Sequence, residues 1–144
     1  YTTLFRSNRL YDSIHFVQNT AWEAEGWFLC GSRGWLCPGS EDFTVQDEKI
    51  YKRELLRLQM SLEDAKRQGA EHLIGVLHYP PSSANGRGSE FTRAFEEAGV
   101  SQVVYGHLHG ADAYRKGMKG KYNGIEYRLV SLDYLKCRPV CIKE

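Results

Sequence analysis

The chain has 144 residues and a nearly balanced charge, with 19 Lys and Arg against 18 Asp and Glu and a formal net charge of +1 at pH 7. This length suits a single domain, which most often contains about 100 to 150 residues. The balanced charge gives no broad field that would recruit nucleic acid or an anionic membrane. No run approaches the roughly 18 apolar residues of a membrane-spanning helix, and the first residues lack the zones of a signal peptide. We therefore expect a cytoplasmic protein.

The first third of the chain predicts a β-hairpin followed by a long helix. Residues 14–22 (IHFVQNTAW) and 26–30 (GWFLC) are short aromatic and β-branched runs separated by a charged turn, as in paired strands. The turn-forming residues 31–42 come next. From Asp47 an apolar stripe recurs at steps of four and three residues, and Gly69 can end the helix. The stripe consists of Tyr51, Leu55, Leu58, Leu62 and Ala65.

A strand, a helix and a second strand are predicted in the middle of the chain. Residues 72–81 (HLIGVLHYPP) form a nearly continuous apolar run that ends in two prolines, as expected of a strand buried on both faces. Ser89 can cap a short helix that Gly99 ends, and residues 101–110 (SQVVYGHLHG) supply the second strand. Such a βαβ unit predicts parallel strands with a right-handed crossover.

The last third is predicted to be a loop and two strands. Residues 110–124 are rich in glycine and lysine and are interpreted as a solvated loop, with attraction of phosphate by its basic side chains as the alternative. Residues 125–135 (IEYRLVSLDYL) and 138–144 (RPVCIKE) are predicted strands, antiparallel to each other. The predicted fold class is therefore α/β, with a βαβ unit followed by antiparallel strands.

Four cysteines allow either three disulfide pairings or the ligation of zinc. They are Cys30, Cys37, Cys137 and Cys141. Their spacings differ from the tight Cys-x-x-Cys pairs of structural zinc sites, and nothing else in the sequence indicates secretion. We therefore expect reduced thiols that are mostly buried as small apolar side chains.

Three histidines are expected at one edge of the sheet. Ligands bind outside the carboxyl ends of parallel strands, where His78 ends the first strand of the βαβ unit and His107 and His109 end the second. Residues two apart on a strand point the same way, roughly 6 to 7 Å apart, so His107 and His109 can serve one metal ion each, with His78 converging on one of them. A single histidine at a strand end is more often structural, but three at one edge favour metal. His15 and His72 lie elsewhere and are expected to be structural or solvent-facing.

Two pairs of motifs resemble a known family. VLHYPP (76–81) and VYGHLHG (104–110) are similar to the last two metal-binding blocks of the calcineurin-like metallophosphoesterases. GSRGW (31–35) with DEKIYKREL (47–55) resembles a bacterial subgroup of predicted phosphohydrolases in that family. The resemblance covers nearly the whole chain and implies the C-terminal half of an αββα sandwich.

The same resemblance implies a dinuclear centre that hydrolyses a phosphate ester. It assigns His78 and His107 to one divalent ion and His109 to the other, and a metal-activated hydroxide would attack the phosphorus. Mixed imidazole and carboxylate ligation suits manganese, iron or zinc. Arg33, between two glycines, would bind a phosphoryl oxygen of the substrate.

The earlier metal-binding blocks of the family are absent from the sequence. These are an Asp-x-His, a Gly-Asp-x-x-Asp and a Gly-Asn-His-Asp/Glu block, which supply the remaining ligands. We therefore expect residues 8–144 to be the C-terminal part of one metallophosphoesterase domain, with its N-terminal half as the missing partner. Residues 1–7 (YTTLFRS) match the translation of a widely used sequencing adapter, and we expect them to be foreign to the natural protein. The chain alone should then have little or no phosphatase activity.

Other functional classes explain the histidines less well. A histidine-triad nucleotide hydrolase would need a third histidine at the position of Ala111, and an amidohydrolase barrel needs far more chain than the 35 residues after His109. A non-catalytic scaffold or interaction domain that keeps the fold without a working site is the alternative to the enzyme. The substrate stays open among nucleotides, phosphoproteins, phosphodiesters and small phosphomonoesters.

Overall fold

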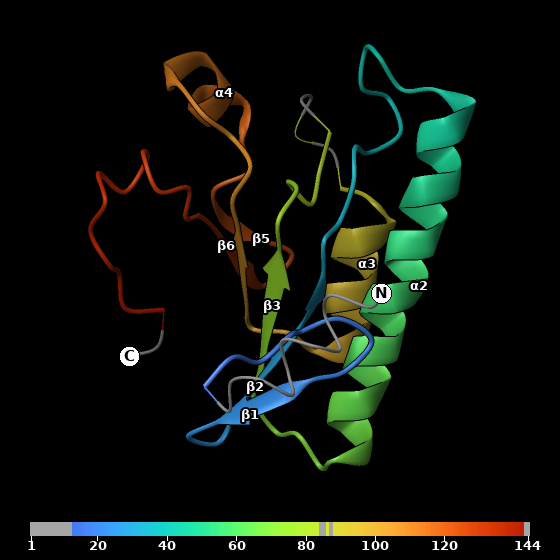
Figure 1. Ribbon diagram of the computed structural model, residues 1–144, viewed down its shortest axis with the longest axis vertical. Coiled ribbons are helices and arrows are strands. Elements are labelled where there is room, and N and C mark those ends of the chain that lie inside the picture. The colour runs from blue at the N-terminus through green and yellow to red at the C-terminus, as the bar shows by residue number, and fades with distance from the viewer. Residues whose placement is uncertain (1–12, 84–85, 87, 143–144) are drawn as a thin grey trace.

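A mixed sheet lies at the centre of the computed structural model, which describes residues 13–83, 86 and 88–142 (Figure 1). The described residues form six strands in the order β1-β2-β3-β4-β6-β5. The four inner strands run parallel, and a short antiparallel strand lies at each edge. The strands are β1 (Trp22–Ala24), β2 (Trp27–Ser32), β3 (Leu73–Leu77), β4 (Gln102–Tyr105), β5 (Gly120–Tyr122) and β6 (Ile125–Leu129). The predicted α/β class is confirmed, and the suspected adapter residues 1–7 lie outside the described residues.

The predicted hairpin is present, but its first strand is much shorter than residues 14–22. Strands β1 and β2 pair through a tight turn at Glu25 and Gly26, whose φ angles are 53° and 81°. Residues 14–21 form no strand, and at the end of this segment helix side chains bind the backbone. Ser61 donates to the carbonyl of Thr20, and the Asp64 carboxylate accepts from the amide of Ala21.

The long helix α2 (Val45–Arg67) confirms the predicted apolar stripe. Thr44 caps it in a capping box with Asp47, and four of the five stripe residues are buried, whereas Leu55 is half-buried. The same face also buries two polar residues that the stripe does not predict, Glu54 and Ser61. Ser61 accepts from the amide of Gly31 on β2, which ties the helix to the sheet.

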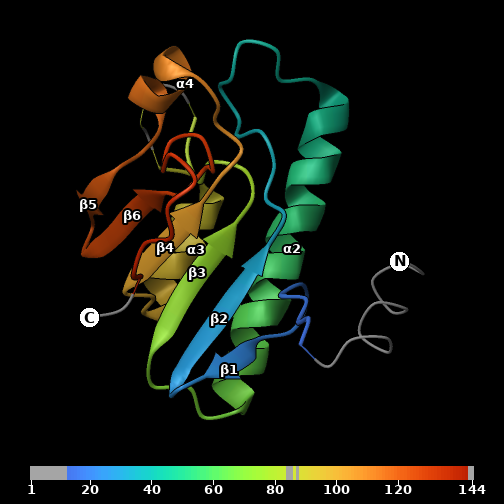
Figure 2. The ribbon, with the colours of Figure 1, turned by 60° about the vertical axis from the view of Figure 1, so that its left-hand side comes forward.

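The central βαβ unit also confirms its prediction. Strands β3 and β4 are parallel neighbours joined through α3 (Glu90–Ala98), which Ser89 caps and Gly99 ends in the left-handed conformation. Helices α2 and α3 cover the same face of the sheet (Figure 2). A Cβ atom at Gly75 of β3 would lie 2.6 Å from the ring of Phe95, so this glycine lets α3 pack closely.

The last third differs from its prediction in three ways, the first being that the strand predicted over 125–135 ends at Leu129 and is followed by turns over 132–137. Residues 110–124, predicted as a loop, contain α4 (Ala111–Lys116) and strand β5, which forms a hairpin with β6 through Asn123 and Gly124. The Asn-Gly pair is a strong hairpin signal that the sequence interpretation passed over. The strand predicted over 138–144 is wrong for its described residues, 138–142, which form none. Pro139 cannot donate to a ladder, and the guanidinium of Arg128 donates to the carbonyl of Cys141 instead.

Candidate metal centre

The sheet topology brings His78 and His107 together. Each follows a parallel strand at its carboxyl end, since His78 comes directly after β3 and His107 comes two residues after β4. The amide of Gly106 donates to the carbonyl of His78 over 3.2 Å, which continues the strand pairing to the histidines themselves. The predicted convergence of these two residues is therefore present in the structure.

The two ring nitrogens lie at a separation that suits one metal ion. His107 Nδ1 is 3.2 Å from His78 Nε2, and the rings meet edge to face at 78°. Two nitrogens on one tetrahedral zinc ion, each about 2.05 Å from it, lie about 3.3 Å apart. The separation is that of a hydrogen bond between the two rings, and it also matches the spacing of two nitrogen ligands on one divalent ion.

Neighbouring rings fix the orientation of His107. Tyr79 stacks on its imidazole with ring centroids 4.0 Å apart, and Trp35 contacts Tyr79 from a tilted position. Burial lowers the pKa of His107, and the nearby positive forms of His78 and His109 lower it further. A lowered pKa favours the neutral imidazole, which is the form that ligates metal.

His109 points to a different partner. Its Nδ1 lies 3.0 Å from Oδ1 of Asp133, whose other carboxylate oxygen accepts from the hydroxyl of Tyr114. The Tyr114 hydroxyl, more than any other neighbour, lowers the pKa of Asp133 to about 2, so the carboxylate is charged at neutral pH. A carboxylate on one nitrogen of a histidine orients the other toward a metal in many metalloproteins. The assignment of His109 to a second metal stays a prediction, and Asp133 is a site residue that the sequence interpretation missed.

Arg33 lies beside the pair through its backbone. Its carbonyl accepts from the amides of His78 and Tyr79, at 3.1 and 3.0 Å. Its guanidinium lies 4.4 Å from the centre of the Trp35 ring and 3.5 Å from the carboxylate of Glu54. The backbone proximity agrees with the predicted position of Arg33, while its role in substrate binding stays a prediction.

The flanking glycines and the other histidines have distinct environments. Gly110, directly after His109, has a φ of 85°, in the left-handed region that favours glycine, whereas Gly106, directly before His107, has no positive φ. His15 stacks on Trp22 and His72 contacts Trp27, and both histidines are exposed, which agrees with the expected structural or solvent-facing role.

Two of the four cysteines are buried. Cys30 and Cys37 are reduced and buried, whereas Cys137 and Cys141 are exposed, so burial was predicted correctly for the first two.

Across residues 13–83, 86 and 88–142, no group of three or more His, Cys, Asp or Glu side chains is arranged to hold a metal ion. The described residues therefore bring two histidine nitrogens close together and contain no complete metal site.

Comparison with known proteins adds no relatives. None of the family models, curated proteins or solved structures compared with the chain matches it. Within the described part of the chain, no helix has both the length and the apolar character that crossing a membrane requires.

Proposed function

We propose that the chain is part of a metal-dependent phosphoesterase of the calcineurin-like type. The observation that supports this most strongly is the 3.2 Å approach of His78 Nε2 and His107 Nδ1 at the carboxyl ends of two parallel strands. The motifs VLHYPP and VYGHLHG carry the resemblance, and they are the segments that this topology brings side by side.

The residues of this chain would have separate roles in such a centre. His78 and His107 would hold one divalent ion, and His109, oriented by Asp133, would hold a second. Two ions of manganese, iron or zinc would supply an activated hydroxide and would polarise a phosphoryl oxygen. Gly110 lets the chain turn away directly after the histidines, which leaves their edge of the sheet open to a phosphate ester.

The remaining ligands would come from the N-terminal half of the domain. The described residues bring only two histidine nitrogens to one point, and carboxylate ligands would have to complete the site. The same observation supports the second candidate, a non-catalytic scaffold that keeps the fold without binding metal. Direct metal binding separates the two.

Cobalt binding by the chain tests the proposal, because ligation by imidazole changes the visible absorption of Co²⁺. We expect Co²⁺ titration to give a weak absorption change, and His78→Ala and His107→Ala to lower the affinity at least about tenfold. His72→Ala is the control, since His72 lies against Trp27 away from the pair. Unchanged cobalt binding in both site variants would contradict the proposal and favour the scaffold.

A further inference from the structure

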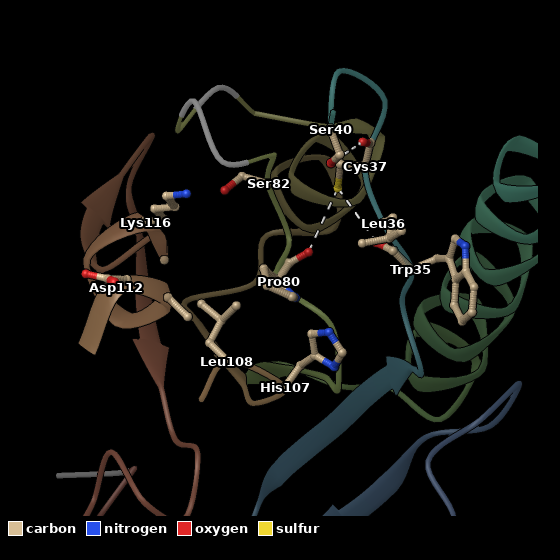
Figure 3. A pocket seen from close by; sticks show the side chains of 12 residues that line it. Trp35, Leu36, Cys37, Ser40, Pro80, Ser82, His107, Leu108, Asp112 and Lys116 are labelled. Atoms are coloured by element: carbon tan, nitrogen blue, oxygen red, sulfur yellow. Dashed lines mark hydrogen bonds between the residues drawn. The ribbon is translucent and has the colours of Figure 1, made fainter. Parts of the chain in front are cut away.

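A pocket of about 310 Å³ opens beside His107, between the segment after β2 and helix α4 (Figure 3). This volume lies at the lower end of the range for ligand pockets, about 300 to 1,000 Å³. His107 forms part of its lining, and His78 lies 3.2 Å from His107. A small ligand can therefore contact the histidine pair at one end and fill the pocket with the other.

Apolar side chains form most of the pocket wall. The apolar lining residues are Leu36, Cys37, Pro80 and Leu108, together with Ala113 of α4. Burial raises the pKa of the Cys37 thiol to about 11, so this side chain is neutral at physiological pH. Its sulfur contacts the carbonyls of Trp35 and Pro80 rather than a charged group. The wall near His107 therefore offers no strong hydrogen-bonding partner to a ligand.

The Ser40 hydroxyl, on the segment after β2, donates to the carbonyl of Cys37, and the charged side chains of the lining lie on the side of the pocket near α4 (Figure 3). Lys116 and Asp112 lie there, and Asp112 is paired with Arg115. The hydroxyl of Ser82 is buried in the same region and has no hydrogen-bond partner within the described part of the chain. A buried hydroxyl without a partner is uncommon and indicates a place where a ligand or water binds.

We propose that this pocket holds the apolar aryl or alkyl group of a phosphate ester whose phosphate contacts His78 and His107. This inference rests on the proposed function, because that function places the phosphate at the histidines. The hydroxyls of a sugar or polyol group would give up their hydrogen bonds to water on entering the pocket, and the side chains of Leu36, Pro80 and Leu108 could not replace these bonds. A compact apolar group gains from the same burial, and the Ser82 hydroxyl can bind one polar substituent.

Methyl NMR of the leucine-labelled chain tests the inference with phenylphosphonate and methylphosphonate, which carry the same anionic group. We expect phenylphosphonate to bind at least about tenfold more tightly than methylphosphonate and to shift the methyl signals of Leu36 and Leu108. The exposed Leu56 and Leu132 lie outside the pocket lining and serve as internal controls.

Two variants on the same helix make the test specific. Ala113→Phe fills the pocket and should remove the preference for phenylphosphonate, whereas Ala111→Phe adds the same ring at an exposed position outside the lining and should preserve it. Dispersed leucine methyl signals verify that each variant is folded. Equal affinity for the two phosphonates, or equal effects of the two variants, would overturn the inference.

The result of the phosphonate test can be told apart from the result of the cobalt titration that tests the proposed function. Cobalt binding that depends on His107, without selectivity for phenylphosphonate, overturns the pocket assignment and leaves the phosphoesterase proposal standing. Selectivity that is lost in Ala113→Phe supports the pocket assignment even if His107→Ala leaves cobalt binding unchanged, and in that case the metal centre is contradicted.

Discussion

The backbone of His107 stores local strain at the candidate site. Its φ angle is 67°, and the amide of Leu108 donates to the carbonyl of Gly106, so His107 is the central residue of a γ-turn. A turn of this hand is rare and strained for a residue other than glycine. Stacking on Tyr79 and proximity to His78 compensate for part of that cost. Such strain is concentrated at functional sites, which agrees with a role of His107 in binding.

At Cys37, burial should make a thiol resistant to modification. Burial raises its pKa to about 11, whereas Cys137 is exposed. Because the thiolate is the reactive form, we expect Ellman's reagent at pH 8 to modify Cys137 rapidly and Cys37 only after unfolding. Mass spectrometry of the labelled peptides measures this order. Rapid labelling of Cys37 in the folded chain would show that its side of the pocket opens readily.

The raised pKa of the Cys37 thiol determines how its contribution to the free energy of unfolding changes with pH. A thiol whose folded pKa is raised above the ordinary 9.0 is favoured in its neutral form, so its contribution to stability is complete below pH 9 and is lost as the pH rises toward the folded value of about 11. Cys37→Ser should therefore weaken the decline of stability above pH 9, as measured by urea unfolding across this range.

Glu54 should contribute strongly to stability because it is a fully buried carboxylate. Its side chain is 0% exposed, and Oε1 lies 2.7 Å from the guanidinium of Arg57 and 3.5 Å from that of Arg33. Glu54→Ala removes the shared counter-charge of these arginines, whose side chains are 17% and 43% exposed and can be solvated, so we expect it to lower the free energy of unfolding by about 1 to 3 kcal/mol. Glu63→Ala, at an exposed position of the same helix, should change the free energy of unfolding by less than about 0.5 kcal/mol. Similar losses for both variants in chemical unfolding would contradict the prediction.

At the scale of the elements, local signals predicted more than long-range pairing did. Helices α2 and α3 follow from caps and apolar periodicity within their own sequence, and both predictions are confirmed. Strand β6 was predicted, but its parallel pairing with β4 depends on residues far away in the chain. The glycine- and lysine-rich composition of residues 110–124 gave no signal for α4 and β5, although Asn123-Gly124 marks the hairpin of β5 with β6.

The same difference between local and long-range signals decides which features of the candidate site could be predicted. The approach of His78 and His107 could be predicted, because parallel neighbouring strands end at the same edge of the sheet. The contact of His109 with Asp133 could not, because Asp133 lies 24 residues further along, in a turn after β6 whose position no local pattern determines. The burial of Glu54 also escaped prediction, because it depends on arginines that the fold brings together.

The packing of β2 against β3 depends on Gly31. A Cβ atom at this position would lie 1.9 Å from the carbonyl oxygen of Val76, a backbone atom that cannot move without disturbing the ladder. We expect Gly31→Ala to lower the free energy of unfolding by about 3 kcal/mol or more. Gly106→Ala is the matched control, because a Cβ atom there meets only the carbonyl of His78 at 3.9 Å and its φ is not positive. Thermal unfolding should therefore show a large shift for Gly31→Ala and a small one for Gly106→Ala.

At the scale of the whole molecule, the helices leave the second face of the sheet less well covered than the first. Helices α2 and α3 cover one face (Figure 2), where Leu77 belongs to the main apolar cluster. Ile74 and Val104 are buried outside that cluster, and Leu29 and Val76 are half-buried. The sheet edges are short strands, β1 and β5, which limits edge-to-edge pairing. Any self-association of the chain should therefore involve the second face rather than the edges.

The two histidine nitrogens of the candidate site should be too few to make the chain an active phosphoesterase by itself. Two histidine nitrogens can hold an ion only weakly, and a metal-activated hydroxide requires a firmly positioned ion. We expect the 144-residue chain with Mn²⁺ or Zn²⁺ to hydrolyse bis(p-nitrophenyl) phosphate no faster than the same ion in buffer. If the chain is the C-terminal part of a metallophosphoesterase domain, as proposed, a protein that joins it to the N-terminal part should be active, and His107→Ala should abolish that activity. Rapid hydrolysis by the chain alone, lost in His107→Ala but kept in His72→Ala, would show that its own residues complete the metal centre.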